Sequence, residues 1–79
     1  MEIQIDTTRN VAYLKFSDES KQVRTIEISD DILVDVDGEG IVQGVELLNA
    51  SQQLGQSGIS NLRLINRISG NRIDVELPV

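Results

Sequence analysis

The strongest constraint on this chain is an alternation of large apolar and polar side chains over several short segments. Ile3 and Ile5 alternate with polar neighbours near the start, and Ile73, Val75 and Leu77 do the same near the end. Successive side chains of a strand point to opposite faces, so a period of two is typical of a half-buried strand. Ile and Val also favour strands, because their branched side chains are stiff. The sequence therefore predicts a β-rich fold.

Turn residues between the alternating segments separate seven expected strands. These strands cover residues 2–6, 11–16, 23–28, 32–37, 41–48, 62–67 and 72–77. Gly38 and Gly40 can adopt the positive φ of a tight turn between the fourth and fifth strands. The fifth strand carries apolar doublets on both of its faces, which suggests a central position. We expect an antiparallel meander of five strands over residues 3–48.

The segment after the fifth strand predicts a short helix. Residues 49–54 are compatible with one helical turn that Gly55 ends, with Asn49 as a possible N-cap. Residues 59–68 fit both helical spacing and strand alternation, and the alternating segment 72–77 favours a hairpin over a helix followed by a strand. The predicted fold class is α+β, mainly β, with an all-β fold as the alternative, in a single domain over residues 1–79.

Composition excludes several classes of function. Thirteen acidic against seven basic residues give a net charge of −6, which disfavours nucleic-acid binding. The absence of Cys and His removes thiolate ligands, disulfides and the Ser-His-Asp triad, so we expect neither an enzyme nor a cofactor. No long apolar run and no signal peptide are recognised, so we expect a cytoplasmic protein without membrane contact.

One acidic segment resembles a calcium-binding loop. Asp35, Asp37, Glu39, Gly40 and Glu46 fall at positions 1, 3, 5, 6 and 12 of an EF-hand pattern. An EF-hand needs a helix on each side, whereas both flanks of this segment alternate as strands. We therefore expect a turn with exposed, solvated acids and no metal site, and a weak cation site at Asp35, Asp37 and Glu39 remains the alternative.

The same segment carries a family resemblance. Residues 35–51 read D-V-D-G-E-G-I-V-Q-G-V-E-L-L-N-A-S, after A-Y-L-K-F at residues 12–16 and T-I-E at residues 25–27. This order resembles DUF2283, a family of small bacterial proteins of unknown function. The resemblance covers most of residues 3–51 and leaves residues 55–79 unmatched. It implies a fold and a bacterial source, and it implies no activity.

Two hypotheses about interaction follow from size and charge. A single core in a chain this short supplies only about 3–5 kcal/mol, so we expect a non-enzymatic interaction or structural module that self-associates as a homo-oligomer. Residues 25–62 contain seven acids and neither Lys nor Arg. The alternative is therefore an antitoxin-like protein whose acidic face binds a basic partner protein, such as a ribonuclease-like toxin.

Overall fold

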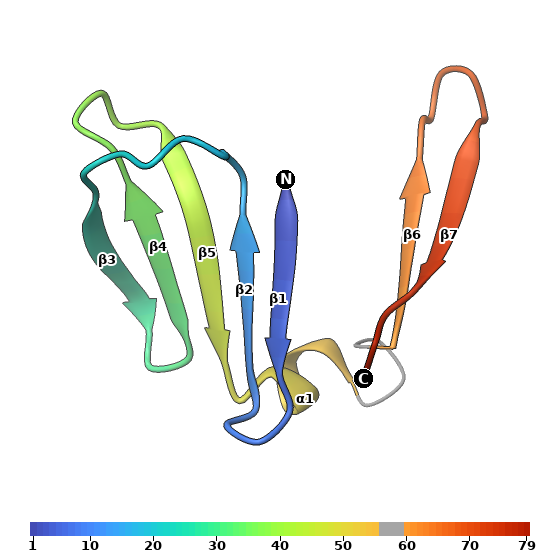
Figure 1. Ribbon diagram of the computed structural model, residues 1–79, viewed down its shortest axis with the longest axis horizontal. Helices are drawn as coiled ribbons and strands as arrows, with labels where there is room; N and C mark the ends of the chain where they lie inside the picture. Colours follow the sequence, from blue (N-terminus) through green and yellow to red (C-terminus); the bar gives the residue numbers. More distant parts are fainter. Residues whose placement is uncertain (56–59) are drawn as a thin grey trace.

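The computed structural model describes residues 1–55 and 60–79, which form a five-stranded antiparallel sheet, one short helix and a separate two-stranded hairpin (Figure 1). The predicted fold class is confirmed, and each predicted strand is present with ends within two residues. The elements are β1 Glu2–Asp6, β2 Val11–Lys15, β3 Arg24–Ser29, β4 Ile32–Val36, β5 Val42–Leu48, α1 Ala50–Leu54, β6 Asn61–Ile65 and β7 Arg72–Glu76. The alternative of a helix within residues 59–68 depended partly on Ile59, which lies outside the described residues.

The strand order corrects the predicted meander. The sheet runs β1-β2-β5-β4-β3, so β5 lies between β2 and β4. A meander would have placed β5 at an edge, in conflict with its apolar residues on both faces, and the prediction of a central strand is the one confirmed. Residues 16–23 cross the end of β5 to reach β3 at the far edge (Figure 1).

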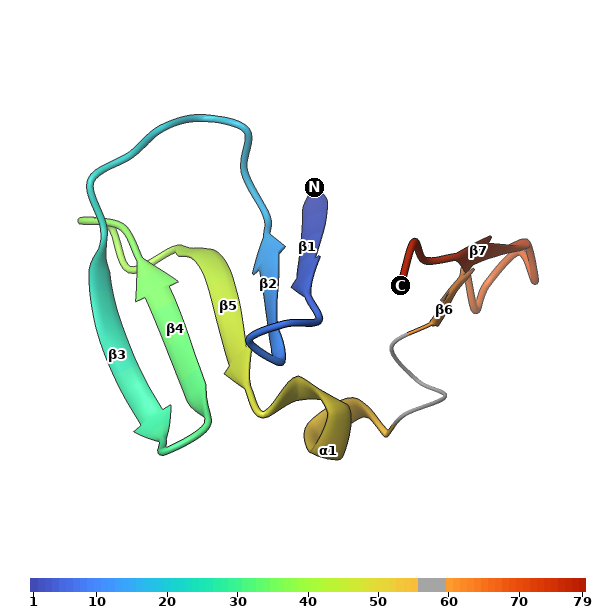
Figure 2. The ribbon, with the colours of Figure 1, turned by 60° about the horizontal axis from the view of Figure 1, so that its bottom comes forward.

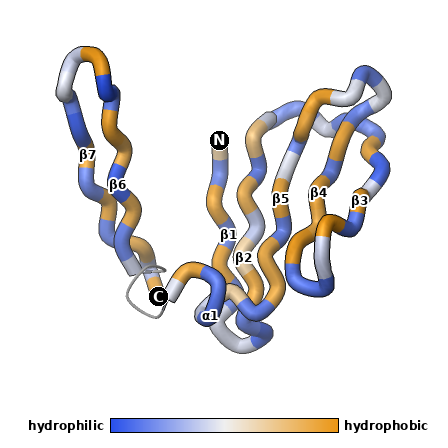
Figure 3. Tube along the Cα trace, turned by 180° about the vertical axis from the view of Figure 1, so that it is seen from behind, coloured by the Kyte–Doolittle hydropathy of each residue, from blue (hydrophilic) through white to orange (hydrophobic). Residues whose placement is uncertain are grey.

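The register gathers the aliphatic side chains on one face of the sheet. Directly paired residues point to the same face, and the pairs form two rows across the strands. The first row is Ile3, Leu14, Val45, Val34 and Ile26, and the second is Ile5, Ala12, Leu47 and Ile32. We call these nine residues the apolar face. Figure 3 shows the resulting alternation of hydropathy along the strands.

No second layer of the described chain covers the apolar face. Among the described residues, the buried hydrophobic side chains are Ala12, Val36 and Ala50, and no large side chain is fully buried. Every residue of the apolar face except Ala12 is only half-buried. Figure 2 shows the sheet as a single layer, with α1 at one end and the hairpin to one side.

The β1–β2 turn caps helix α1. Asn49 occupies the N-cap position, as predicted, with a left-handed φ of 52°, but its side chain makes no capping bond. Asn10 provides the cap instead, because its Oδ1 accepts the backbone N–H of Ser51 at 2.9 Å. Its Nδ2 donates to Asn49 Oδ1 at 3.2 Å and to Ser51 Oγ at 3.0 Å. Gly55, with φ 73°, ends the helix as predicted.

We expect Asn10→Gly to lower the free energy of unfolding by about 1 kcal/mol, the usual cost of a lost helix cap. Glycine tolerates the φ of 57° at this position, so the substitution removes the side chain without adding backbone strain. Thermal denaturation followed by circular dichroism should show a melting temperature about 4–8 °C lower. An unchanged melting temperature would show that the cap contributes nothing.

The predicted C-terminal hairpin is confirmed. Leu62 pairs with Val75 and Leu64 with Ile73, which places four aliphatic side chains on one side of β6 and β7. The turn contains Gly70 with φ 78°, and its N–H donates to the carbonyl of Asn66 at 2.8 Å. The hairpin stands beyond β1, on the side of the sheet away from β3 (Figure 1).

Candidate interaction surface and acidic turn

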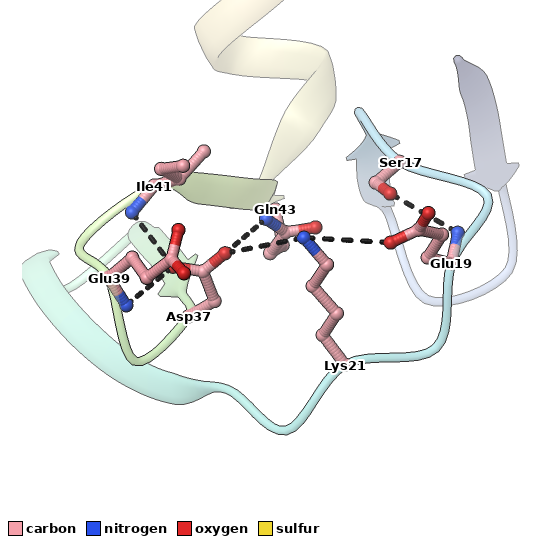
Figure 4. A network of polar contacts seen from close by, with 7 residues as sticks. All are labelled: Ser17, Glu19, Lys21, Asp37, Glu39, Ile41 and Gln43. Carbon is pink, nitrogen blue, oxygen red and sulfur yellow. Dashed lines mark hydrogen bonds and ion pairs between the residues drawn. The ribbon is translucent and has the colours of Figure 1, made fainter.

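Asp37 organises the turn between β4 and β5 (Figure 4). Its Oδ1 accepts the backbone N–H groups of Glu39 and Ile41 at 2.9 and 3.0 Å, and its Oδ2 accepts Gln43 Nε2 at 2.9 Å. The residue is only 7% exposed, so the expectation of a solvated acid is wrong at this position. A carboxylate that accepts this many hydrogen bonds can be buried without an unsatisfied charge.

Lys21 connects the crossing segment to the same carboxylate. Its Nζ lies 3.7 Å from Asp37 Oδ2 and 3.6 Å from Glu19 Oε2. The hydrogen bond from the Ile41 N–H lowers the pKa of Asp37 most strongly, with further lowering from the Glu39 N–H, Lys21 and Gln43 against the opposing effect of burial. Asp37 therefore joins the turn to residues 16–23, the segment that connects β2 with β3 across the end of β5.

We expect Asp37→Asn to remove a stabilisation that depends on pH. Because the folded-state pKa of Asp37 is lowered, the ionised carboxylate stabilises the fold above its unfolded-state pKa of about 3.9. That stabilisation is lost as the pH falls through the folded-state pKa. The melting temperature of the wild type should exceed that of the variant at pH 7, and the difference should shrink below about pH 4.

The exposed neighbour Glu39 offers the matched control for this comparison. Glu39→Gln removes an acid from the same turn, but it leaves Asp37 in place as the acceptor for the backbone N–H groups of that turn. It should follow the wild-type melting temperature across the same pH range. A difference between Asp37→Asn and the wild type that stays constant down to pH 2 would contradict the assigned role of the carboxylate.

Asp35 belongs to a different set of contacts, on the opposite face from the aliphatic rows. Its Oδ2 accepts the Tyr13 hydroxyl at 2.8 Å, and its Oδ1 accepts the Thr25 hydroxyl at 2.7 Å. These bonds tie β2 and β3 to β4, and the Tyr13 side chain lies over Gly44 of the intervening β5. Burial raises the pKa of the Tyr13 hydroxyl, and the bond to Asp35 raises it further.

The structure does not bring the three candidate cation ligands together. Asp35 faces Tyr13 and Thr25, Asp37 is enclosed by its own turn, and Glu39 is exposed. Glu46 of the EF-hand pattern pairs with Tyr13 and Leu33 in the middle of the sheet. Within residues 1–55 and 60–79, no group of three or more acidic side chains is placed to hold a metal ion.

The chain exposes more surface than a compact domain of its size. A folded monomer of 8.7 kDa exposes about 4700 Å² on average, whereas this chain exposes 6051 Å². Its radius of gyration is 13.9 Å, against about 11.6 Å for a compact domain of 79 residues. The excess is about 1300 Å². Among the described residues, the apolar face is half-buried, and Leu64, Ile73 and Val75 of the hairpin are exposed.

The opposite side of the sheet is acidic. Strand residues that point to this side include five acids, which are Glu2, Asp6, Glu27, Asp35 and Glu46. In these five strands, all of which lie in the described part of the chain, Lys15 is the one cation on this side. We call this side the acidic face. One side of the sheet therefore carries the aliphatic rows, and the other side carries the acids together with the apolar side chains of Val11, Leu33 and Leu48.

The sequence alternation predicted the strands without locating the apolar face or the acidic face. Both surfaces follow from the strand pairing, which the alternation alone did not determine. The described residues include no helix that is long and apolar enough to cross a membrane.

The comparisons with known proteins identify a family. A family model described as a protein of unknown function (DUF2283) matches residues 2–51. No curated protein and no solved structure shows significant similarity to the chain. The matched residues include the whole five-stranded sheet and the start of α1, and the hairpin lies outside them.

Proposed function

The chain belongs to DUF2283, a family of unknown function, and we propose that it acts as a non-enzymatic module that assembles as a homodimer through the apolar face of its sheet. The single observation that carries this proposal is the uncovered apolar face. A sheet that is apolar on one side normally packs that side against another layer. The second copy supplies that layer.

Width and area both favour a second copy as the covering layer. The apolar rows extend over five strands, and the described chain has no other element of that width. Another copy of the sheet has the same width and the same apolar character, as a two-fold interface requires. The excess area of about 1300 Å² per chain lies within the range of about 1000–2500 Å² per subunit that obligate homodimers bury.

The melting temperature tests this proposal, because the stability of an obligate dimer depends on protein concentration. Raising the concentration from about 1 to 100 μM should stabilise the dimer by about 2.7 kcal/mol. For two chains of this size, that change raises the melting temperature by about 5–10 °C. A cooperative transition whose midpoint does not move over this range would contradict the homodimer.

The acidic face supports a second candidate function, the binding of a basic partner protein. When the apolar faces pack together, the two acidic faces point outward on opposite sides of the dimer. Such a charged surface accelerates association with a protein of opposite charge. An antitoxin-like role against a basic toxin in a bacterial cytoplasm fits this surface.

Charge reversal on the acidic face tests the second candidate. The probe is a basic protein encoded beside this chain's gene, with purified wild type and Glu27→Lys compared by calorimetry. Binding that weakens with salt and with the charge reversal would support the role. Equal affinity of both forms would remove it without affecting the homodimer.

A further inference from the structure

We propose that the β6–β7 hairpin is exchanged within the dimer, so that the hairpin of each copy lies over the β3–β4 edge of the partner's sheet. This inference rests on the proposed homodimer and names the contact that completes it. It assigns an interaction role to the part of the chain that the family match does not include.

The hairpin needs an external surface to be stable. An isolated two-stranded hairpin is at best marginally stable in water. On β6 and β7, the aliphatic side is open, with Leu64 52%, Ile73 62% and Val75 39% exposed. The side chains on the other side include the Arg63–Asp74 ion pair, with Nε and Oδ1 2.7 Å apart. The hairpin thus has one side suited to water and one suited to an apolar surface.

The order of strands indicates which surface the hairpin covers. Across the molecule, the strands run β3, β4, β5, β2, β1, and the hairpin follows beyond β1 (Figure 1). A two-fold axis parallel to β2 and between the layers places a reversed copy of this order above the first. In that arrangement β2 lies over the partner's β2, β1 over the partner's β5, and the hairpin over the partner's β4 and β3.

This arrangement covers every strand of both apolar faces. Sheet-to-sheet contact alone would leave both hairpins uncovered. A hairpin that folded back onto the sheet of its own chain would cover only two of the five strands of that sheet. With exchange, the dimer has two layers that lie about 10 Å apart, as in other sandwiches. Each layer contains the five sheet strands and the two hairpin strands of one chain. The hairpin side chains that meet the partner's Ile26 and Val34 are those of Leu64 and Ile73.

Cross-linking between two differently substituted chains tests the exchange. The chain has no Cys, so single Ile26→Cys and Ile73→Cys chains each carry one thiol. We would mix an affinity-tagged Ile26→Cys chain with an untagged Ile73→Cys chain, and allow the subunits to re-equilibrate. A short bis-maleimide reagent would then be added. The expected major product is a cross-linked pair of one tagged and one untagged chain.

The neighbouring residue Ile65 provides the matched control. Ile65 is 55% exposed on β6 and pairs with Arg72 on the charged side of the hairpin. Ile65→Cys mixed with Ile26→Cys should give little of the mixed product. Equal yields from the Ile73→Cys and Ile65→Cys mixtures would overturn the exchange, and so would the absence of a mixed product from both.

Substitution with lysine provides a second measurement that needs no cross-linker. Leu64→Lys should weaken the dimer at least about tenfold, as expected for a charge placed in an apolar contact, whereas Ile65→Lys should not. Sedimentation of the wild-type chain separates the two proposals. A wild-type dimer without the mixed product contradicts the exchange and retains the homodimer, and a wild-type monomer contradicts both.

Discussion

Val45→Lys should convert the dimer to monomers, whereas Glu46→Lys should leave it intact. Val45 lies in the middle of the central strand β5 and in the row that crosses all five strands. In the proposed dimer, a lysine at this position would bury an unpaired charge, which costs about 3 kcal/mol or more. Two copies of the substitution enter each symmetric interface. The dissociation constant should therefore rise by at least about a hundredfold.

Glu46→Lys is a strict control because it introduces the same side chain one residue away. Glu46 points to the acidic face, where it pairs with Tyr13 and Leu33. Sedimentation velocity at equal concentrations distinguishes the two variants, and circular dichroism reports whether each retains strand structure. Equal dissociation of both variants would contradict the assignment of the apolar face as the interface.

Gly44→Ala should destabilise the fold by about 1–3 kcal/mol, the usual cost of overpacking. A Cβ at Gly44 would lie 2.6 Å from Tyr13 Cζ and 3.0 Å from the carbonyl oxygen of Leu14, and it would also clash with the Tyr13 hydroxyl. The Tyr13 ring would have to move, which would break its bond to Asp35. The melting temperature should fall by about 4–8 °C for each kcal/mol.

Two comparisons show whether the Tyr13 side chain causes this loss. Gly38→Ala should be nearly neutral, because no atom lies within 4 Å of the added Cβ. In a Tyr13→Ala background, Gly44→Ala should cost much less, and a double-mutant cycle measures the difference. Chemical denaturation supplies the free energies. Equal costs of Gly44→Ala in both backgrounds would contradict the proposed clash.

The alternation of apolar residues was sufficient to predict the strands, because side-chain direction in a strand follows directly from sequence position. It was insufficient to predict their order. Apolar residues on both faces of residues 41–48 already indicated a central strand, and this signal was inconsistent with a meander. With β5 in the centre, residues 16–23 have to cross its end to reach β3, and within this crossing Lys21 contacts Asp37, which lies far away in the sequence.

The polar sites were harder to predict from local patterns. Asn49 stands where a capping residue belongs, but the capping oxygen comes from Asn10, 39 positions away. Asp37 was expected to be solvated because it lies in an acidic, glycine-rich turn. Backbone N–H groups of that same turn allow its burial. The one available signal was the spacing of Asp37 before Glu39, since Asp side chains often accept backbone bonds two residues ahead.

The molar mass of the wild-type protein in solution tests the account most directly. Sedimentation equilibrium at micromolar concentration should give twice the 8.7 kDa of one chain, because a second copy covers the apolar face in the proposed homodimer. A folded species of 8.7 kDa under these conditions, with the β-rich circular dichroism spectrum retained, would contradict the homodimer.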